Sequence, residues 1–304
     1  MKRTPRNLRR LATEQSNPAS ANLDRKSSLE IARIINSEDA KVARAVRRSL
    51  PQIARAIDLI AAALSSGGRL IYVGTGTSGR IAALDAAECP PTFGIAPRTI
   101  QFIMAGGRGA LASAVEASED SRELGRKEMA KRKPTKNDVA VGIAASGRTP
   151  FTIAAVEYAR AHGAKTVAIT CNRKSPLEKA AHMAIVTEVG PEVVAGSTRM
   201  KAGTAQKMIL NMLSTGAMVR LGYVYGGLMV NLRPKNDKLL ERSLGILEKT
   251  AGLNRTDARK LLTSARNHVP VALVMAKTSM SRAKAEAALK KSRGQVRQAI
   301  AAAR

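Results

Sequence analysis

Aromatic side chains are scarce in this sequence. There is no tryptophan, and Phe, Trp and Tyr together make up 2% of the 304 residues. Proteins that bind single-stranded nucleic acid usually stack the bases on aromatic side chains. The shortage argues against such a binding surface. The hydrophobic content of 44% is nevertheless ordinary for a globular protein, and it is enough to build a sizeable core.

Metal-ligating and disulfide-forming residues are also few. The chain has two cysteines, Cys89 and Cys171, and three histidines, with no Cys/His cluster at the spacing of metal ligands. A disulfide framework and a zinc site are therefore not expected. The cysteine usage fits a reducing compartment.

Long apolar runs are missing as well. An apolar window such as residues 57–64 is too short and contains Asp58, whereas a membrane-spanning helix needs about 20 apolar residues. The amino terminus is basic but lacks the apolar core of a secretory signal. We expect a soluble, cytoplasmic protein with no membrane partner.

Acidic residues are outnumbered. The 23 Asp and Glu residues face 51 Lys and Arg residues, which gives a formal net charge of +28. A surface of this kind attracts anionic sugar phosphates and binds polyanions weakly. Because the basic residues are dispersed through an amino-terminal arm and the carboxy-terminal helices, no specific nucleic-acid partner is expected.

The apolar spacing predicts three parts. Residues 1–27 form an arm, residues 28–235 form the main domain, and residues 236–304 form a small helical bundle interrupted at Gly252, Asn267, Pro270, Thr278 and Gly294. Within the main domain, helical spacing from Ser28 to about Ser65, broken at Pro51, predicts two helices. A further helix is expected from about Arg199 to Arg220.

The centre of the chain repeats a strand, a loop and a helix. Short apolar runs at residues 70–73, 100–104, 139–143, 166–170 and 184–186 predict five strands, most of them followed by a Gly- or Ser-containing turn. Strands that alternate with helices form a parallel sheet covered by helices, which is the α/β class. Ligands bind such sheets in the crevice at the carboxyl ends of the strands.

Two of these loops are candidates for an anion site. Residues 74–80 (Gly-Thr-Gly-Thr-Ser-Gly-Arg) include Thr77 and Ser78, and residues 144–150 (Ala-Ala-Ser-Gly-Arg-Thr-Pro) include Ser146 and Thr149. Amides and hydroxyls at helix starts offer donors to phosphate. Each loop alone could be a structural turn or a helix cap. Two on neighbouring strand ends favour a phosphate monoester as ligand.

A third candidate segment precedes the long helix. It contains Ser197, Arg199 and Lys201, and either Ser197 or Thr198 could cap the helix. Positive charges at a helix amino terminus oppose the helix dipole. Their position is easier to explain if an anion lies there, although plain surface charge is an equal alternative.

Acidic residues that could act as catalysts are not singled out by spacing. Glu88 precedes Pro90 and Pro91, where we expect the helix to end, and Glu119 lies in an acidic stretch. Most such residues are solvated charges on helix surfaces.

The combination of motifs resembles one family. Residues 13–20, 74–80, 88–92, 119–121, 142–150 and 197–215 are similar to the N-acetylmuramic acid 6-phosphate etherases, and they occur in that family's order over almost the whole chain. Together they are far more specific than any one motif. They also set the chain apart from generic sugar isomerase (SIS) domains.

The resemblance implies a SIS-type core, a carboxy-terminal bundle similar to ubiquitin-associated domains, and a homodimer with the site near the subunit interface. Substrate contacts would fall on Thr77, Ser78, Ser146 and Thr149, with Ser197, Arg199 and Lys201 as further candidates. Ala144 and Ala145 replace polar residues that sugar isomerases often have in this loop. Some phosphate contacts must therefore come from amides or from elsewhere.

The resemblance also implies a lyase reaction of cell-wall amino-sugar recycling. The substrate, N-acetylmuramic acid 6-phosphate, would lose D-lactate by elimination, and addition of water would give N-acetylglucosamine 6-phosphate. Glu119 would remove the C2 proton of the open-chain sugar, and Glu88 would protonate the departing ether oxygen. Neither a metal nor a redox cofactor is required.

Three alternatives stay open at this point, one of which is a nucleic-acid binder that only the net charge of +28 motivates. A SIS-type aldose-ketose isomerase would use a base near C2 but release no lactate. A non-catalytic sugar-phosphate sensor resembling the glucokinase regulatory protein would bind through the same loops without turnover.

Overall fold

The computed structural model describes residues 11–113, 118–232, 234 and 236–303. The basic residues at positions 2–10 of the predicted arm lie outside these ranges. The chain divides into two compact units, the first with residues 1–87 and 98–214 and the second with residues 88–97 and 215–304. The second unit thus begins earlier in the chain than the predicted boundary at residue 236.

The first unit is built on a parallel sheet of five strands in the order β2-β1-β3-β4-β5. The strands are β1 Leu70–Gly74, β2 Ile100–Met104, β3 Val139–Ile143, β4 Lys165–Thr170 and β5 Met183–Val186. Every neighbouring pair is parallel, so all the carboxyl ends lie at one edge. The predicted α/β class is confirmed, and each strand lies within one residue of its predicted bounds.

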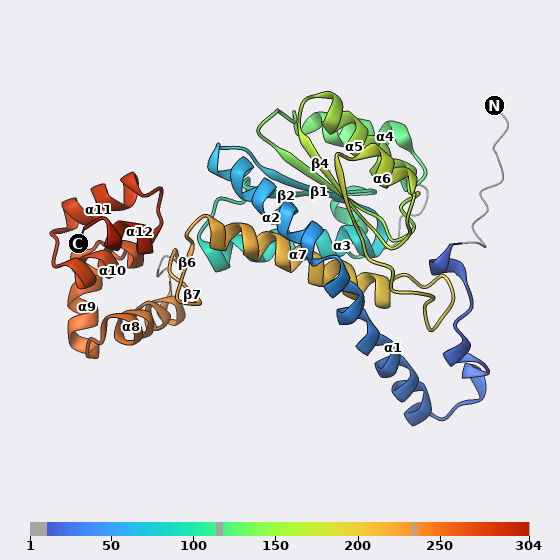
Figure 1. Ribbon diagram of the computed structural model, residues 1–304, viewed down its shortest axis with the longest axis horizontal. Helices are drawn as coiled ribbons and strands as arrows, with labels where there is room; N and C mark the ends of the chain where they lie inside the picture. The colour runs from blue at the N-terminus through green and yellow to red at the C-terminus, as the bar shows by residue number, and fades with distance from the viewer. Residues whose placement is uncertain (1–10, 114–117, 233, 235, 304) are drawn as a thin grey trace. The chain divides into compact units, whose positions relative to one another are not determined.

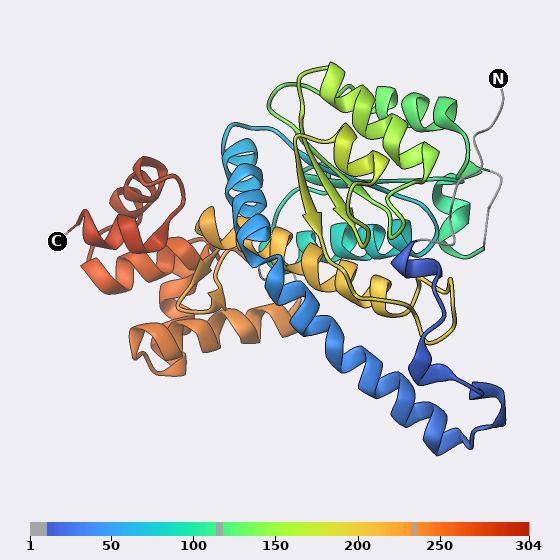
Figure 2. The ribbon, with the colours of Figure 1, turned by 45° about the vertical axis from the view of Figure 1, so that its right-hand side comes forward.

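Helices cover both faces of this sheet (Figures 1 and 2). The helices on one face are α4 Arg122–Lys131, α5 Pro150–Ala161 and α6 Pro176–Ala180, and those on the other are α2 Leu50–Ser65, α3 Gly76–Phe93 and the first part of α7 Lys201–Arg220. Side chains of β1 and β3 meet Phe151 and Ala155 of α5 in a buried cluster. Burying both faces explains why the strands are continuously apolar rather than alternating.

The remaining helix of the first unit, α1 Ser28–Arg48, begins with a capping box. The Ser27 side chain accepts from the Glu30 amide, and the Glu30 carboxylate accepts from the Ser27 amide, which fixes the first turn. Its amino-terminal half extends away from the sheet in both views (Figures 1 and 2). Short 3₁₀ turns lie in the arm at Ala12–Glu14, Pro18–Ser20 and Leu23–Arg25, and another follows β2 at Gly107–Leu111.

The end of α3 differs from the prediction. The expected exit at Pro90 and Pro91 is wrong, because the helix continues to Phe93. Both prolines lie in the last turn, so the helix continues for only three residues beyond Pro90. The Thr92 hydroxyl donates to the Glu88 carbonyl at 2.7 Å. The helix ends instead at Gly94, whose φ of +67° is a conformation that glycine adopts without strain.

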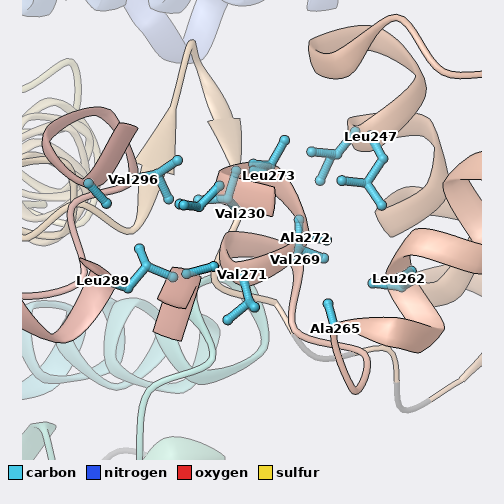
Figure 3. Close-up of a cluster of buried hydrophobic side chains, with 14 of the residues drawn as sticks. Val230, Leu247, Leu262, Ala265, Val269, Val271, Ala272, Leu273, Leu289 and Val296 are labelled. Carbon is cyan, nitrogen blue, oxygen red and sulfur yellow. The ribbon is translucent and has the colours of Figure 1, made fainter. Parts of the chain in front are cut away.

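In its described residues, the second unit contains the ends of α3 and α7, a hairpin and five further helices. The hairpin joins β6 Val224–Tyr225 to β7 Leu228–Met229, and the helices are α8 Asp237–Ala251, α9 Arg255–Ser264, α10 Val269–Thr278, α11 Arg282–Lys291 and α12 Val296–Ala301. Figure 3 shows their side chains converging around Leu273 and Ala272 of α10, both fully buried. This cluster is the core that the predicted helical bundle needs. Over the described residues, no helix combines the length and hydropathy that a membrane crossing requires.

Candidate functional site

The two predicted phosphate loops both lie at the carboxyl edge of the sheet. The first runs directly from β1 into α3, whose helical turns already begin at Gly76. Thr75 and Ser78 are buried and Thr77 is half-buried. The second follows β3, the neighbour of β1, and leads into α5. The topology therefore brings both loops to adjacent strand ends, as predicted.

Hydrogen bonds fix the second loop while leaving hydroxyls for a ligand. The Ala145 carbonyl accepts from the Cys171 amide at 2.9 Å and from Asn172 Nδ2 at 3.1 Å. Ser146 Oγ accepts from the Arg148 amide at 3.2 Å. Thr149 is the N-cap residue of α5, but its side chain makes no capping bond. Thr149 therefore does not act as a side-chain helix cap, which was the structural alternative to ligand binding.

Glu119 lies between the two loops. Its backbone carbonyl accepts from the Phe151 amide at 3.1 Å, in the first turn of α5. Its Oε1 atom lies 3.3 Å from the point where a Cβ on Gly76 would be. One residue thus contacts the start of both loop-helix units. A half-buried carboxylate at this place can accept a proton from a ligand held by the loops.

Glu88, the other predicted catalytic residue, is on the exposed side of α3. It belongs to the second compact unit, whereas Glu119 belongs to the first. Its neighbour Cys89 is a buried cysteine.

The third predicted segment is organised by carboxylates of the protein itself. Glu192, which is fully buried, accepts from the amides of Lys201 and Ala202, both at 2.9 Å. It therefore caps α7, in place of the Ser197 or Thr198 side chain considered from the sequence. An acidic group at this position satisfies two free N–H groups and complements the helix dipole.

Lys201 is buried in an ion pair. Its Nζ lies 2.6 Å from Glu38 Oε2, and both side chains are at most 3% exposed. Asn17 Nδ2 donates to the same carboxylate at 2.9 Å. Burial favours a raised pKa for Glu38, but the hydrogen bonds from Lys201, Lys41 and Asn17 prevail and lower it to about 2. The anion that the sequence suggested beside Lys201 is thus Glu38.

The other residues of this segment stay open to a ligand. Arg199 is exposed and Ser197 is half-buried, with its amide donating to the Val194 carbonyl at 2.9 Å. The arm lies against the same region, since Asn172 Nδ2 donates to Thr13 Oγ1 at 3.3 Å and Glu14 Oε2 lies 3.4 Å from the Cβ position of Gly196.

A row of side-chain hydrogen bonds joins α3 to α7, and it was not predicted from the sequence. Ser78 Oγ donates to Gln206 Oε1 at 2.9 Å. Further along the two helices, Asp85 accepts from Asn211 Nδ2 at 2.8 Å and from Ser214 Oγ at 3.0 Å. Burial raises the pKa of Asp85. Asn211 and Ser214 lie in the motif at residues 197–215 that supports the family resemblance, so their importance could have been inferred. The sequence alone does not show that they bond to Asp85.

The described residues contain no group of three His, Cys, Asp or Glu side chains able to hold a metal ion. The edge of the sheet has a set of hydroxyls and helix amides, and the Glu119 carboxylate lies beside Gly76. This arrangement suits a phosphorylated ligand and proton transfer.

Family models match two overlapping parts of the chain. Residues 52–160 match the glucokinase regulatory protein N-terminal SIS domain, and residues 123–216 match the SIS domain. A phosphoheptose isomerase from Francisella tularensis is similar in structure, with a TM-score of 0.48 and 20% identity over 64% of this chain and 100% of that one.

Curated relatives are similar over nearly the whole length. The N-acetylmuramic acid 6-phosphate etherase of Clostridium beijerinckii is 48% identical over 294 residues, 97% of both chains. That of Aeromonas hydrophila is 49% identical over 291 residues, 96% of this chain and 98% of the relative. The resemblance inferred from the motifs is therefore confirmed, and the chain belongs to the N-acetylmuramic acid 6-phosphate etherase family.

Proposed function

We propose that this protein cleaves the lactyl ether of N-acetylmuramic acid 6-phosphate, releasing D-lactate and N-acetylglucosamine 6-phosphate. The observation that carries the proposal is the position of Glu119, a carboxylate held against Gly76 of one loop and bonded through its backbone to the helix after the other. Similarity over 97% of the chain to an enzyme of this name selects this reaction among those that a base beside a sugar phosphate could perform.

The phosphate is held by the two loops. Thr77 and Ser78 contribute from the start of α3, and Ser146 and Thr149 from the start of α5. Amides at both helix starts add donors, which compensates for the apolar Ala144 and Ala145. Arg199 and Ser197, which stay open to a ligand, complete the contacts. Lys201 takes part only indirectly, since its ammonium group is the counter-ion of Glu38.

The reaction begins from the open-chain aldehyde, because the C1 carbonyl acidifies the proton at C2. Glu119 takes that proton, the electron pair forms the C2–C3 double bond, and the C3–O bond breaks. Glu88 gives a proton to the ether oxygen, which leaves as the hydroxyl of lactate. Water then adds across the double bond, with its hydroxyl on C3 and its proton on C2.

Each of the two carboxyl groups has a distinct task. Glu119 must be ionised and Glu88 protonated at the start of a turnover, and a positioned acid or base commonly contributes about a hundredfold to ten-thousandfold. No redox change occurs, because the products differ from the substrate by one added water.

The protein acts as a homodimer in the cytoplasm. The homodimer is supported by an aliphatic stripe along α1. Its second half, Val42, Ala45 and Val46, is buried, whereas its first half, Ile31, Ile34 and Ile35, is only half-buried. Burying them against a second copy would remove more apolar surface from water. Both cysteines are buried and neither is in a disulfide, which suits a reducing compartment.

Lactate release from purified protein and N-acetylmuramic acid 6-phosphate tests the function. The expected products are lactate and a sugar with the mass of N-acetylglucosamine 6-phosphate, in equal amounts. An isomerase of the same fold would convert phosphosugars without lactate, and a sensor would bind the substrate unchanged. Either result would replace the proposal.

A further inference from the structure

Gln206 of α7 contacts one of the proposed phosphate residues. Its Oε1 atom accepts a hydrogen bond from Ser78 Oγ at 2.9 Å. Gln206 is 1% exposed and Ser78 is 9% exposed. The contact joins the first turn of α3 to a helix more than a hundred residues later in the chain, and the reaction described above gives Gln206 no role.

The helices approach closely enough to hold this contact in place. A Cβ on Gly203 of α7 would lie 3.3 Å from Thr77 Cγ2, so the absence of a side chain at Gly203 lets α7 pack closely against the first loop. Gln206 lies three residues after Gly203, on the same face of the helix. The Ser78 side chain is thus fixed from the α7 side, while Glu119 lies against Gly76 two residues earlier.

The direction of this hydrogen bond matters for phosphate binding. A serine hydroxyl has one proton, and Ser78 gives it to Gln206. In this state Ser78 can only accept from a ligand, whereas an ionised phosphate offers acceptors and no donor. Gln206 Nε2 is meanwhile buried without a hydrogen-bond partner among the described residues, and an unmet buried donor is costly.

Turning the amide by 180° about its last side-chain bond addresses both problems. The rotation exchanges Oε1 and Nε2 within the same volume, so that Nε2 donates to Ser78 Oγ and the serine proton becomes available. Oε1 then loses its donor, but buried carbonyl oxygens tolerate this better than N–H groups do. A hydrogen bond to a charged phosphate is also stronger than one between neutral groups.

We propose that Gln206 is a positioning residue for the substrate phosphate, whose amide turns on binding to donate to Ser78 and direct the Ser78 proton onto a phosphate oxygen. The inference rests on the proposed function, in which Ser78 contacts the phosphate. Gln206 itself touches no reacting atom.

Two substitutions of similar length separate the possible roles. Gln206→Met keeps the volume but forms no hydrogen bond of this kind, so KM for N-acetylmuramic acid 6-phosphate should rise about threefold to tenfold. Gln206→Glu supplies a group that, when ionised, only accepts and holds the Ser78 proton away from the phosphate. Its KM should rise further, by about tenfold or more. In both variants kcat should stay within about twofold, because the reacting atoms are untouched.

Coupling to Ser78 is the decisive readout. Ser78→Ala alone should raise KM, and adding Gln206→Met or Gln206→Glu to it should change KM little further, because the side chain that Gln206 directs is gone. The matched control is Ser214→Ala, which removes another buried bond between α7 and α3. It should lower the melting temperature and leave KM unchanged.

Three outcomes overturn the inference. Unchanged KM in both Gln206 variants would do so, as would equal KM increases with and without Ser78, which describe packing alone. Unchanged KM in Ser78→Ala would remove the phosphate contact on which the inference depends. If the wild-type protein released no lactate, the result would instead contradict the proposed function. If Gln206→Glu does not fold, Gln206→Met alone still distinguishes these results.

Discussion

Glu119 Oε1 lies 3.3 Å from the position of a Cβ on Gly76. Gly76 has a φ of +49°, so this position favours glycine both for its backbone conformation and for the space that Glu119 occupies. The contact places the proposed base beside the first turn of the helix that holds the phosphate. It also makes the catalytic geometry sensitive to a single methyl group.

Gly76→Ala should therefore lower kcat for lactate release by about tenfold to a hundredfold, because a displaced base loses its alignment with the C2 proton. The matched control is Gly67→Ala, which also requires a positive φ, +77°, but has no neighbour within 4 Å of the new methyl. Gly67→Ala should reduce the melting temperature and leave kcat at the wild-type value. Equal kcat in the two variants would contradict the placement of Glu119.

Lys201→Met should destabilise the protein by about 3 to 5 kcal/mol, since it leaves the buried Glu38 carboxylate without its buried cation. Only the exposed Lys41 would still pair with it. Urea denaturation measures the change in the free energy of unfolding. Adding Glu38→Gln to the variant should restore most of the loss. A stable Lys201→Met protein with a raised KM would instead make Lys201 a direct phosphate contact.

The same pair predicts how stability depends on pH. The pKa of Glu38 is about 2 in the folded protein, below its ordinary value of 4.5. The contribution of Glu38 to the free energy of unfolding is therefore complete above about pH 4.5. It is lost as the pH falls toward about 2, because the Glu38 carboxylate takes up its proton at a higher pH in the unfolded chain than in the folded protein. Denaturation curves at about pH 7, 4.5 and 3 should show a smaller acid loss in Glu38→Gln than in the wild type. Parallel pH profiles would rule out the lowered pKa.

Ile34→Asp should convert the proposed homodimer to monomers, because it places a charge in the half-buried stripe of α1. Sedimentation equilibrium reports the change. Leu29→Glu is the control: Leu29 is 59% exposed and, at 100° per residue, points away from the stripe. A dimer unaffected by Ile34→Asp would require another interface.

Much of the first unit could be predicted from the sequence because its strands are short, continuously apolar and followed by turns. The strands from Ile100 and from Val139 begin and end where expected. Glu119 and Glu88, by contrast, were singled out only by the family resemblance. The structure adds a position for Glu119 that fits the proposed role, and their catalytic roles stay a prediction.

What could not be predicted depends on partners far apart in the chain. Glu192 as the cap of α7, Glu38 as the partner of Lys201, and Gln206 as the partner of Ser78 are all set by tertiary packing. The end of α3 was misjudged because two prolines are tolerated in a final turn. The hairpin at Gly226 and Gly227 was not predicted, although two glycines at positive φ between apolar pairs favour such a turn.

The measurement that bears most directly on the mechanism follows lactate release and exchange of the C2 proton with deuterated water in Glu88→Ala and Glu119→Ala. We expect Glu88→Ala to exchange the C2 proton still while it releases lactate at least about a hundredfold more slowly, and Glu119→Ala to lose both activities by similar factors. Lactate release at the wild-type rate from either variant, or unchanged proton exchange in Glu119→Ala, would contradict this mechanism.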